Sequence, residues 1–133
     1  MNEPETIQKI FKMKIIAVVG LSPNPMRPSH VVVAYLQSRG YRIIPVNPGH
    51  DIILGETSYP SLKDIPEQID VVNVFRKPEH IGSIVDNAIA IGAKALWLQD
   101  GVIDETAAKR AEAAGLLVVM NDCMLRQHKR LFV

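Results

Sequence analysis

The sequence predicts a doubly wound α/β domain, in which a parallel sheet of about five strands lies between two layers of helices. Five short runs rich in Val, Ile and Leu recur along the 133 residues, as expected of strands that are buried on both faces. Stretches of helical periodicity separate these runs. Connections of that length force neighbouring strands into parallel pairing with right-handed crossovers, which places helices on both faces of the sheet.

Strands are expected at five runs, most of them flanked by Gly, Pro or charged residues. The runs are 14–20 (KIIAVVG), 41–46 (YRIIPV), 69–75 (IDVVNVF), 93–98 (AKALWL) and 116–120 (LLVVM). Pro45 places the second run at an edge of the sheet or at its own end, because proline cannot donate to a central ladder. A further short extended piece is expected over residues 54–59.

The helices begin and end at residues that suit helix termini. Pro28 and Pro78 each start a helix, since a proline in the first turn loses no hydrogen bond. Asp104 and Asn121 are the expected N-caps of two later helices. The expected helices cover 6–13, 28–39, 78–91, 104–114 and 121–130, with one helical turn at 61–65. This alternation predicts a three-layer, Rossmann-like sheet with strand order 3-2-1-4-5.

Composition fits one domain over residues 1–133 and excludes several classes of protein. Apolar residues make up 47% and charged residues 22%, as in ordinary globular chains. The net charge of +1 provides no general positive field for nucleic acid or an anionic membrane. No apolar run approaches the ~20 residues that cross a bilayer, and the N-terminus lacks a signal-peptide pattern. With Cys123 as the one cysteine, no internal disulfide is possible, and we expect a reduced, cytoplasmic protein.

A ligand is expected beyond the carboxyl ends of the strands, where the strand order reverses between the first and fourth strands. Four loops reach this crevice: 20–29, 46–50, 75–78 and 99–102. Gly20 allows close approach of the backbone to a ligand, and the Arg27 guanidinium suits a bidentate phosphate contact. The start of the next helix adds free N–H groups and a positive dipole end. Together these features predict a pyrophosphate site.

The first loop departs from the dinucleotide fingerprint G-x-G-x-x-G, because Ser22 and Pro25 stand at the second and third glycine positions. After the second strand, the acidic residue that would hold the ribose of NAD is also missing, and the next acid is Asp51. Both departures argue against NAD. They favour a nucleotide whose ribose needs no acidic partner, such as one that carries a 3′-phosphate.

Arg76 and Lys77 precede the third helix, where cations oppose the helix dipole unless an anion binds there. We therefore expect both side chains to face phosphate. Phe75 is expected either to pack on adenine or pantetheine or to lie in the core, and Trp97 is expected in the core. The histidines show no metal-ligand spacing and no acid–base motif, which predicts surface or capping roles except for His50, beside the proposed ribose.

Five segments that together span about residues 14 to 131 form a specific combination, although each alone is common. They are VVGLSPNPMRPSHVVVAYLQSRGYRIIPVNPG, ILGETSYPSL, DVVNVFRKPEHI, ALWLQDGV and MNDCMLRQHKRL. At these residues the sequence resembles the stand-alone CoA-binding domain proteins, which are relatives of the N-terminal domain of the succinyl-CoA synthetase α subunit. The resemblance implies that the ligand is CoA or an acyl-CoA.

The resemblance also implies which loops touch CoA. The synthetase uses the loop after its first strand, which matches 22–25 here, and the segments that match 46–48 and 98–100. A lysine of the synthetase corresponds to His50, so Arg27, Arg76 or Lys77 is expected to replace it at the 3′-phosphate. No catalytic or metal-binding residue is expected. The candidate cofactor-binding residues are Gly20, Leu21, Ser22, Pro23, Asn24, Pro25, Arg27, Pro28, Ser29, Val46, Asn47, Pro48, His50, Phe75, Arg76, Lys77, Leu98, Gln99 and Asp100.

These observations predict a non-catalytic binding or metabolite-sensing module for CoA or an acyl-CoA, with no enzymatic activity of its own. One alternative is a nicotinamide-dependent oxidoreductase. Another is a subunit of an acyl-CoA ligase, which we expect to need a partner chain because the synthetase carries its phosphorylated histidine in a second domain. A third is a redox sensor in which Cys123 captures CoA as a mixed disulfide. Besides the CoA ligand, a partner chain or a second copy is possible, whereas nucleic acid and membrane are not expected.

Overall fold

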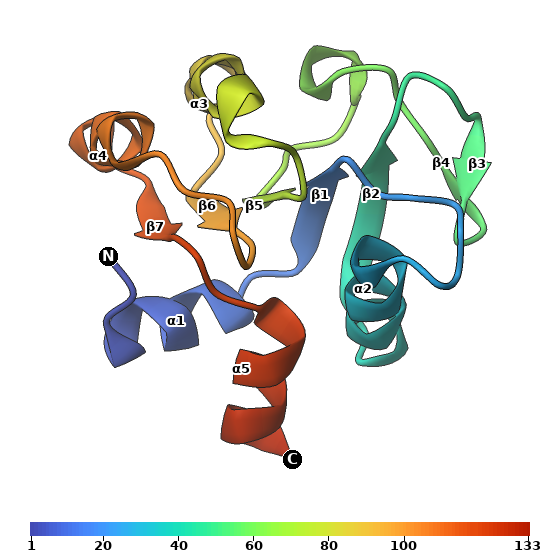
Figure 1. The fold of residues 1–133 in the computed structure, drawn as a ribbon, viewed down its shortest axis with the longest axis horizontal. Coiled ribbons are helices and arrows are strands. Elements are labelled where there is room, and N and C mark those ends of the chain that lie inside the picture. The colour runs from blue at the N-terminus through green and yellow to red at the C-terminus, as the bar shows by residue number, and fades with distance from the viewer.

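The computed structural model describes residues 1–133 and has three layers (Figure 1). Five parallel strands form the central sheet: β1 (Ile15–Val19), β2 (Arg42–Val46), β5 (Val71–Val74), β6 (Ala95–Leu98) and β7 (Leu117–Val119). Helices α1 (Pro4–Phe11), α2 (Pro28–Ser38) and α5 (Met124–Phe132) contribute to the core on one face of the sheet. Helices α3 (Ile81–Ala90) and α4 (Glu105–Ala113) contribute to the core on the other face. The predicted doubly wound α/β class is confirmed.

The strands lie in the order β2-β1-β5-β6-β7. The position outside β2 is taken by one residue, Tyr59, which forms an isolated parallel bridge with Val46. When Tyr59 is counted as a third strand, the order runs 3-2-1-4-5 as predicted, with β5 in fourth place beside β1 and β7 as a sixth strand at the far edge. Counted over the five longer strands alone, it runs 2-1-3-4-5. The order therefore reverses between β1 and β5, and the expected crevice lies there.

The segments around Tyr59 and before α3 are shorter and more tightly turned than expected. The extended piece over 54–59 is a small antiparallel hairpin of β3 (Ile52–Ile53) and β4 (Glu56–Thr57). Leu54 and Gly55 form its turn with positive φ angles of 54° and 74°, as a two-residue hairpin requires. The expected turn at 61–65 is the 3-10 helix η1 (Leu62–Asp64), and α3 is preceded by the 3-10 helix η2 (Pro78–His80).

One predicted helix cap is confirmed and the other is wrong. Asp104 caps α4, and its Oδ1 accepts the N–H of Ala107 at 3.0 Å. Asn121 does not cap α5, which has Cys123 at its N-cap position. Instead Asn121 adopts a positive φ of 57°, and its Oδ1 accepts the N–H of Gly101 at 2.8 Å. Its side chain thus joins the loop after β7 to the loop after β6.

Aromatic side chains fill the core between the sheet and helices α1, α2 and α5. Trp97 is fully buried there, as predicted, and its indole N–H donates to the carbonyl of Asp122 at 2.9 Å. His128 on α5 is 6% exposed, so the surface or capping role expected for it is wrong. Burial lowers the pKa of His128, and the nearby charge of Arg39 lowers it further. None of the helices combines the length and apolar character that spanning a bilayer would require.

Candidate functional site

Two cavities flank the carboxyl end of β1, at the upper edge of the sheet in Figure 1. The α2 cavity has a volume of about 210 Å³ and is lined by Gly20, Ser22, Arg27, Pro28, Ser29 and Phe75. The α3 cavity has a volume of about 240 Å³, and its lining includes Val46, Pro48, Arg76, His80, Ser83 and Asn87. The structure thus brings together candidate residues from the loops after β1, β2 and β5.

Short polar contacts hold the loop between β1 and α2. Ser29 Oγ accepts the N–H of Ser22 at 3.0 Å, and Ser22 Oγ accepts the N–H of Asn24 at 3.1 Å. Asn24 Oδ1 in turn accepts the N–H of Met26 at 2.9 Å. Such side-chain turns order a loop without a helix or a strand.

The start of α2 leaves hydrogen-bond donors free. Arg27 stands at the N-cap position and makes no side-chain cap bond. The backbone N–H groups of Ser29 and His30 have no acceptor within the protein. Because these donors coincide with the positive end of the helix dipole, the α2 cavity suits an anion.

Arg76 and Gly20 lie against each other between the two cavities. Gly20 has a φ of +87°, and a Cβ on it would stand 2.8 Å from the carbonyl oxygen of Phe75. Gly20 is therefore in close contact with the loop after β5, and its approach to a ligand stays a prediction. Gly20 lines the α2 cavity and Arg76 lines the α3 cavity, so this contact forms the ridge between them.

The charge around the two cavities is one-sided. Arg27, Arg76 and Lys77 form no ion pair, whereas Arg42, Arg110 and Arg126 each pair with a carboxylate. No Asp or Glu lines either cavity. Cations without a protein partner at the rim of a cleft raise the local concentration of anionic ligands.

Asn47 joins the loop after β2 to the loop after β1. Its Nδ2 donates to the carbonyl of Leu21 at 3.0 Å, and its Oδ1 accepts the N–H of Gly49 at 2.9 Å. Pro48 and His50 are exposed beside it. The segment predicted to lie near the ribose thus reaches the crevice on a rigid turn.

Some candidate residues have little accessible surface. Leu21, Val46, Leu98 and Gln99 are between 0% and 5% exposed, so their side chains mainly support the loops, although Val46 also lines the α3 cavity. Gln99 Nε2 donates to Asn73 Oδ1 at 3.1 Å, and Gln99 Oε1 accepts the N–H of Met124 at 3.4 Å. This buried network joins β5, β6 and the first turn of α5.

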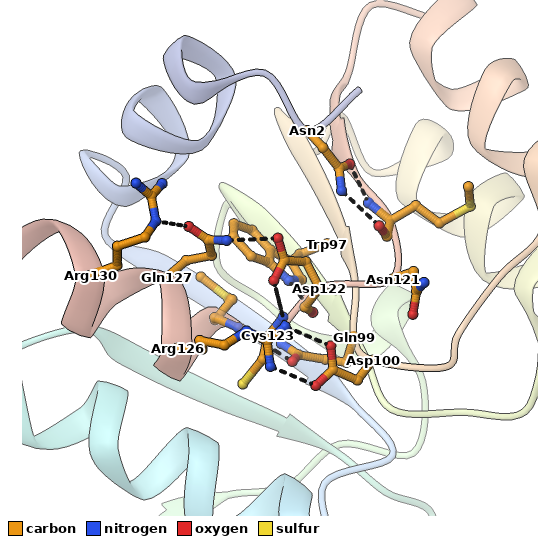
Figure 2. Close-up of polar contacts among 12 residues, drawn as sticks. Asn2, Trp97, Gln99, Asp100, Asn121, Asp122, Cys123, Arg126, Gln127 and Arg130 are labelled. Atoms are coloured by element: carbon orange, nitrogen blue, oxygen red, sulfur yellow. Dashed lines mark hydrogen bonds and ion pairs between the residues drawn. The ribbon is translucent and has the colours of Figure 1, made fainter.

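Asp100 and Cys123 belong to a polar cluster at the start of α5 (Figure 2). Arg126 donates from both terminal nitrogens to Asp100, at 3.0 and 2.9 Å, and also binds Asp122 at 2.8 Å. The Arg126 guanidinium lowers the pKa of the Asp100 carboxyl. Cys123 is partly buried, and its N–H donates to Asp122 Oδ1 at 2.7 Å. None of these residues lines either crevice cavity, and capture of CoA by Cys123 stays a prediction.

Three polar residues of the site were not among the residues that the sequence predicts there. His80, Ser83 and Asn87 line the α3 cavity from one side of η2 and α3. Their spacing of three and four residues places them on one helix face. The sequence pattern that could have identified them is this polar stripe, which lies beside the apolar face of α3.

Comparisons with known proteins agree with this arrangement. The model of the CoA binding domain family matches residues 14–129. The uncharacterized protein YneT of Bacillus subtilis strain 168 is 41% identical over 127 residues, covering 96% of this chain and 94% of YneT. The solved structure of a hypothetical protein from Pyrococcus horikoshii OT3 has a TM-score of 0.93 and 43% identity, covering 97% of this chain and 92% of that one.

The ADP-forming acetate–CoA ligase II of Archaeoglobus fulgidus is 29% identical over 108 residues. That match covers 80% of this chain and 16% of the ligase, so the chain corresponds to a small part of that enzyme. The family match spans most of the sequence and includes every candidate site residue. This chain therefore belongs to the CoA-binding domain family.

Proposed function

We propose that this protein binds CoA or an acyl-CoA in the crevice formed by the α2 and α3 cavities. One observation carries the proposal: Arg27 lines the α2 cavity and Arg76 lines the α3 cavity, neither forms an ion pair, and no carboxylate lines either cavity. Lys77, which also forms no ion pair, follows Arg76 in the sequence. CoA carries a pyrophosphate and a 3′-phosphate, which would supply the missing negative charge. Charge-assisted contacts of this kind are stronger than neutral hydrogen bonds.

The pyrophosphate is assigned to the α2 cavity, where Arg27 and the free N–H groups of Ser29 and His30 can bind it. The adenosine is assigned to the side of Pro48, which lines the α3 cavity. The pantetheine arm would pass the partly exposed ring of Phe75. Arg76 stands between the two cavities and can reach either phosphate group.

We further propose a binding or sensing role rather than catalysis. His80 is the one histidine that lines either crevice cavity, and its Nε2 lies 3.7 Å from Glu79. Ser83 Oγ donates to the carbonyl of His80 at 3.2 Å rather than to its ring. No serine–histidine pair for nucleophilic catalysis is therefore assembled.

Isothermal titration with CoA, 3′-dephospho-CoA, NAD and NADP tests this function. We expect saturable binding of CoA, weaker binding of dephospho-CoA and no measurable binding of NAD. Saturable NAD binding without a CoA signal would overturn the proposal and favour the oxidoreductase alternative. Native mass spectrometry of freshly purified protein provides a second test, because a co-purifying acyl-CoA would identify itself by its mass.

A further inference from the structure

The largest cavity of the molecule is lined by residues of α1 and α5 and by Lys14 and Tyr41, which precede β1 and β2, so it lies at the opposite edge of the sheet from the crevice. Figure 1 shows both helices at that lower end of the molecule. This α1–α5 cavity has a volume of about 440 Å³, larger than either crevice cavity. Its lining includes four apolar or aromatic side chains and two exposed lysines: Phe11, Tyr41, Leu131, Phe132, Lys12 and Lys14. Nothing in the proposed CoA site uses these residues.

His128 directs an unpartnered nitrogen into this cavity. The residue is 6% exposed, and its Nδ1 lies 2.8 Å from the hydroxyl of Tyr35. Its Nε2 has no hydrogen-bond partner, although every fully buried side-chain nitrogen and oxygen in the structure has one. Nε2 must therefore retain some accessible surface, and the α1–α5 cavity is the one cavity that His128 lines.

The protonation of His128 sets what its Nε2 can offer. Burial lowers the pKa of His128, which keeps the imidazole neutral near pH 7. If the Tyr35 hydroxyl donates to Nδ1, the ring hydrogen lies on Nε2. Nε2 is then a hydrogen-bond donor that opens into the cavity, and an acceptor on a ligand would satisfy it.

The charges at the cavity favour an anion. No Asp or Glu lines it, and neither Lys12 nor Lys14 forms an ion pair. Lys12 follows the last turn of α1, where a cation also stabilises the helix dipole. Lys14 lies beyond the helix, with its ammonium 6.0 Å from the centre of the Tyr41 ring. The dipole and the Tyr41 ring therefore account for part of the placement of the two lysines, but neither ammonium has a carboxylate partner.

The aromatic wall favours a flat apolar body. The ring of Phe11 meets the rings of His128 and Phe132 edge-on, at centroid distances of 5.4 and 5.8 Å. Phe132 is nevertheless 56% exposed, so part of this wall is open to water. A ring placed against Phe132 would remove that apolar surface from water and add aromatic contacts.

We propose that the α1–α5 cavity binds a small aromatic carboxylate. The ring would lie against Phe11 and Phe132, and the carboxylate would accept from Lys14 and from His128 Nε2. Lys12 adds a second positive charge at the same opening. This site is separate from the proposed CoA crevice, because the two occupy opposite edges of the sheet.

Titration of the nitrogen-15-labelled protein with 2-naphthoate tests the site by NMR. We expect saturable shifts in α1 and α5, including the ring Nε2 of His128. The neutral analogue 2-naphthamide, which has the same ring body, should bind about tenfold more weakly or worse, because it lacks the charge that the lysines recognise. Saturating CoA should leave naphthoate binding unchanged, whether or not CoA itself binds.

A matched pair of variants completes the test. The double variant Lys12→Gln, Lys14→Gln removes both charges, whereas Lys9→Gln alters an exposed lysine of the same helix that does not line the cavity. We expect about a tenfold or greater loss of naphthoate affinity in the first and none in the second. The proposal would be overturned if the double variant bound naphthoate as tightly as the wild type, if CoA displaced naphthoate, or if no saturable binding occurred. It would also be overturned if sedimentation experiments showed a dimer in which a second copy covers the cavity.

Discussion

Arg76 lies across Gly20, with its Cδ 2.8 Å from the position that a Cβ on Gly20 would occupy. The carbonyl oxygen of Phe75 is equally close to that position, and Gly20 has a φ of +87°. Glycine is therefore required here both by backbone conformation and by space. This contact brings the loop after β1 against the loop after β5, at the point where the strand order reverses.

Replacing Gly20 by Ala should destabilise the fold by about 1–3 kcal/mol through backbone strain, with a further loss from displacement of Arg76. Urea denaturation would measure the free energy of unfolding, and a CoA titration would report the change in the crevice. Gly40→Ala is the matched control, because Gly40 has a φ of +93° but no atom near its Cβ position. Equal losses in both variants would show that the contact with Arg76 is unimportant.

Removing the Arg27 guanidinium should weaken CoA binding without unfolding the protein. Arg27 is exposed and has no ion-pair partner, so Arg27→Ala should leave the free energy of unfolding nearly unchanged. Loss of a charge-assisted phosphate contact should weaken binding by roughly 1.5–3 kcal/mol. Calorimetric titration checks this. Arg130→Ala is the control, because Arg130 lies on α5, contacts Gln127 of that helix and lines neither crevice cavity. Unchanged affinity in Arg27→Ala would remove Arg27 from the site.

Gln99 is expected to act on the fold rather than on the ligand. Gln99→Leu would leave Asn73 Oδ1 and the N–H of Met124 buried without partners, which should cost about 1–3 kcal/mol of stability for each unsatisfied group. The double variant with Asn73→Val should lose less than the sum of the two single variants, because both polar partners are then absent. Chemical denaturation of the four proteins gives the coupling free energy. Additive losses would mean that the two side chains do not interact.

The ion pair between Arg126 and Asp100 should appear in the titration of Asp100. Arg126 lowers the pKa of Asp100 from 3.8, so the pair's contribution to stability is complete above about pH 5 and is lost as the pH falls through the lowered pKa. The contribution of this ion pair to the free energy of unfolding should be small, because both side chains are more than half exposed. NMR titration of the Asp100 carboxyl should give a midpoint below 3.8 in the wild type and a higher one in Arg126→Ala. Coincident midpoints would show that the pair does not form in solution.

His128 should make stability fall with acidification near neutral pH. The pKa of His128 in the folded protein is lowered from its ordinary value of 6.5. At a pH between the folded and the unfolded pKa, the unfolded chain therefore binds a proton that the folded protein does not. Stability should therefore decrease as the pH drops from about 7.5, and this contribution should level off below the folded pKa. In His128→Gln this dependence should be weaker, whereas His50→Gln, at an exposed position, should retain the wild-type profile. Thermal unfolding across this pH range measures it, and identical profiles in all three proteins would contradict the assignment.

Local patterns in the sequence were sufficient to predict the five main strands, the helices between them, the buried Trp97 and the loops that carry the cations of the crevice. These features follow from periodicity, from glycine and proline at element ends, and from the geometry of parallel sheets. Which residues at the carboxyl edge would keep accessible surface was not predictable. Gln99 and Asp100 follow a strand as ligand-binding residues do, yet one bonds within the core and the other pairs with Arg126.

The contact between Asn121 and Gly101, the burial of His128 and the α1–α5 cavity were likewise beyond the reach of sequence patterns. Phe11 and His128 lie near opposite ends of the chain, and their rings meet because α1 and α5 pack on the same face of the sheet. Periodicity encodes which side of an element is apolar, since neighbouring residues along one helix or strand share that side. It carries no information about which distant side chain completes a contact, because that depends on how the loops place whole elements against each other.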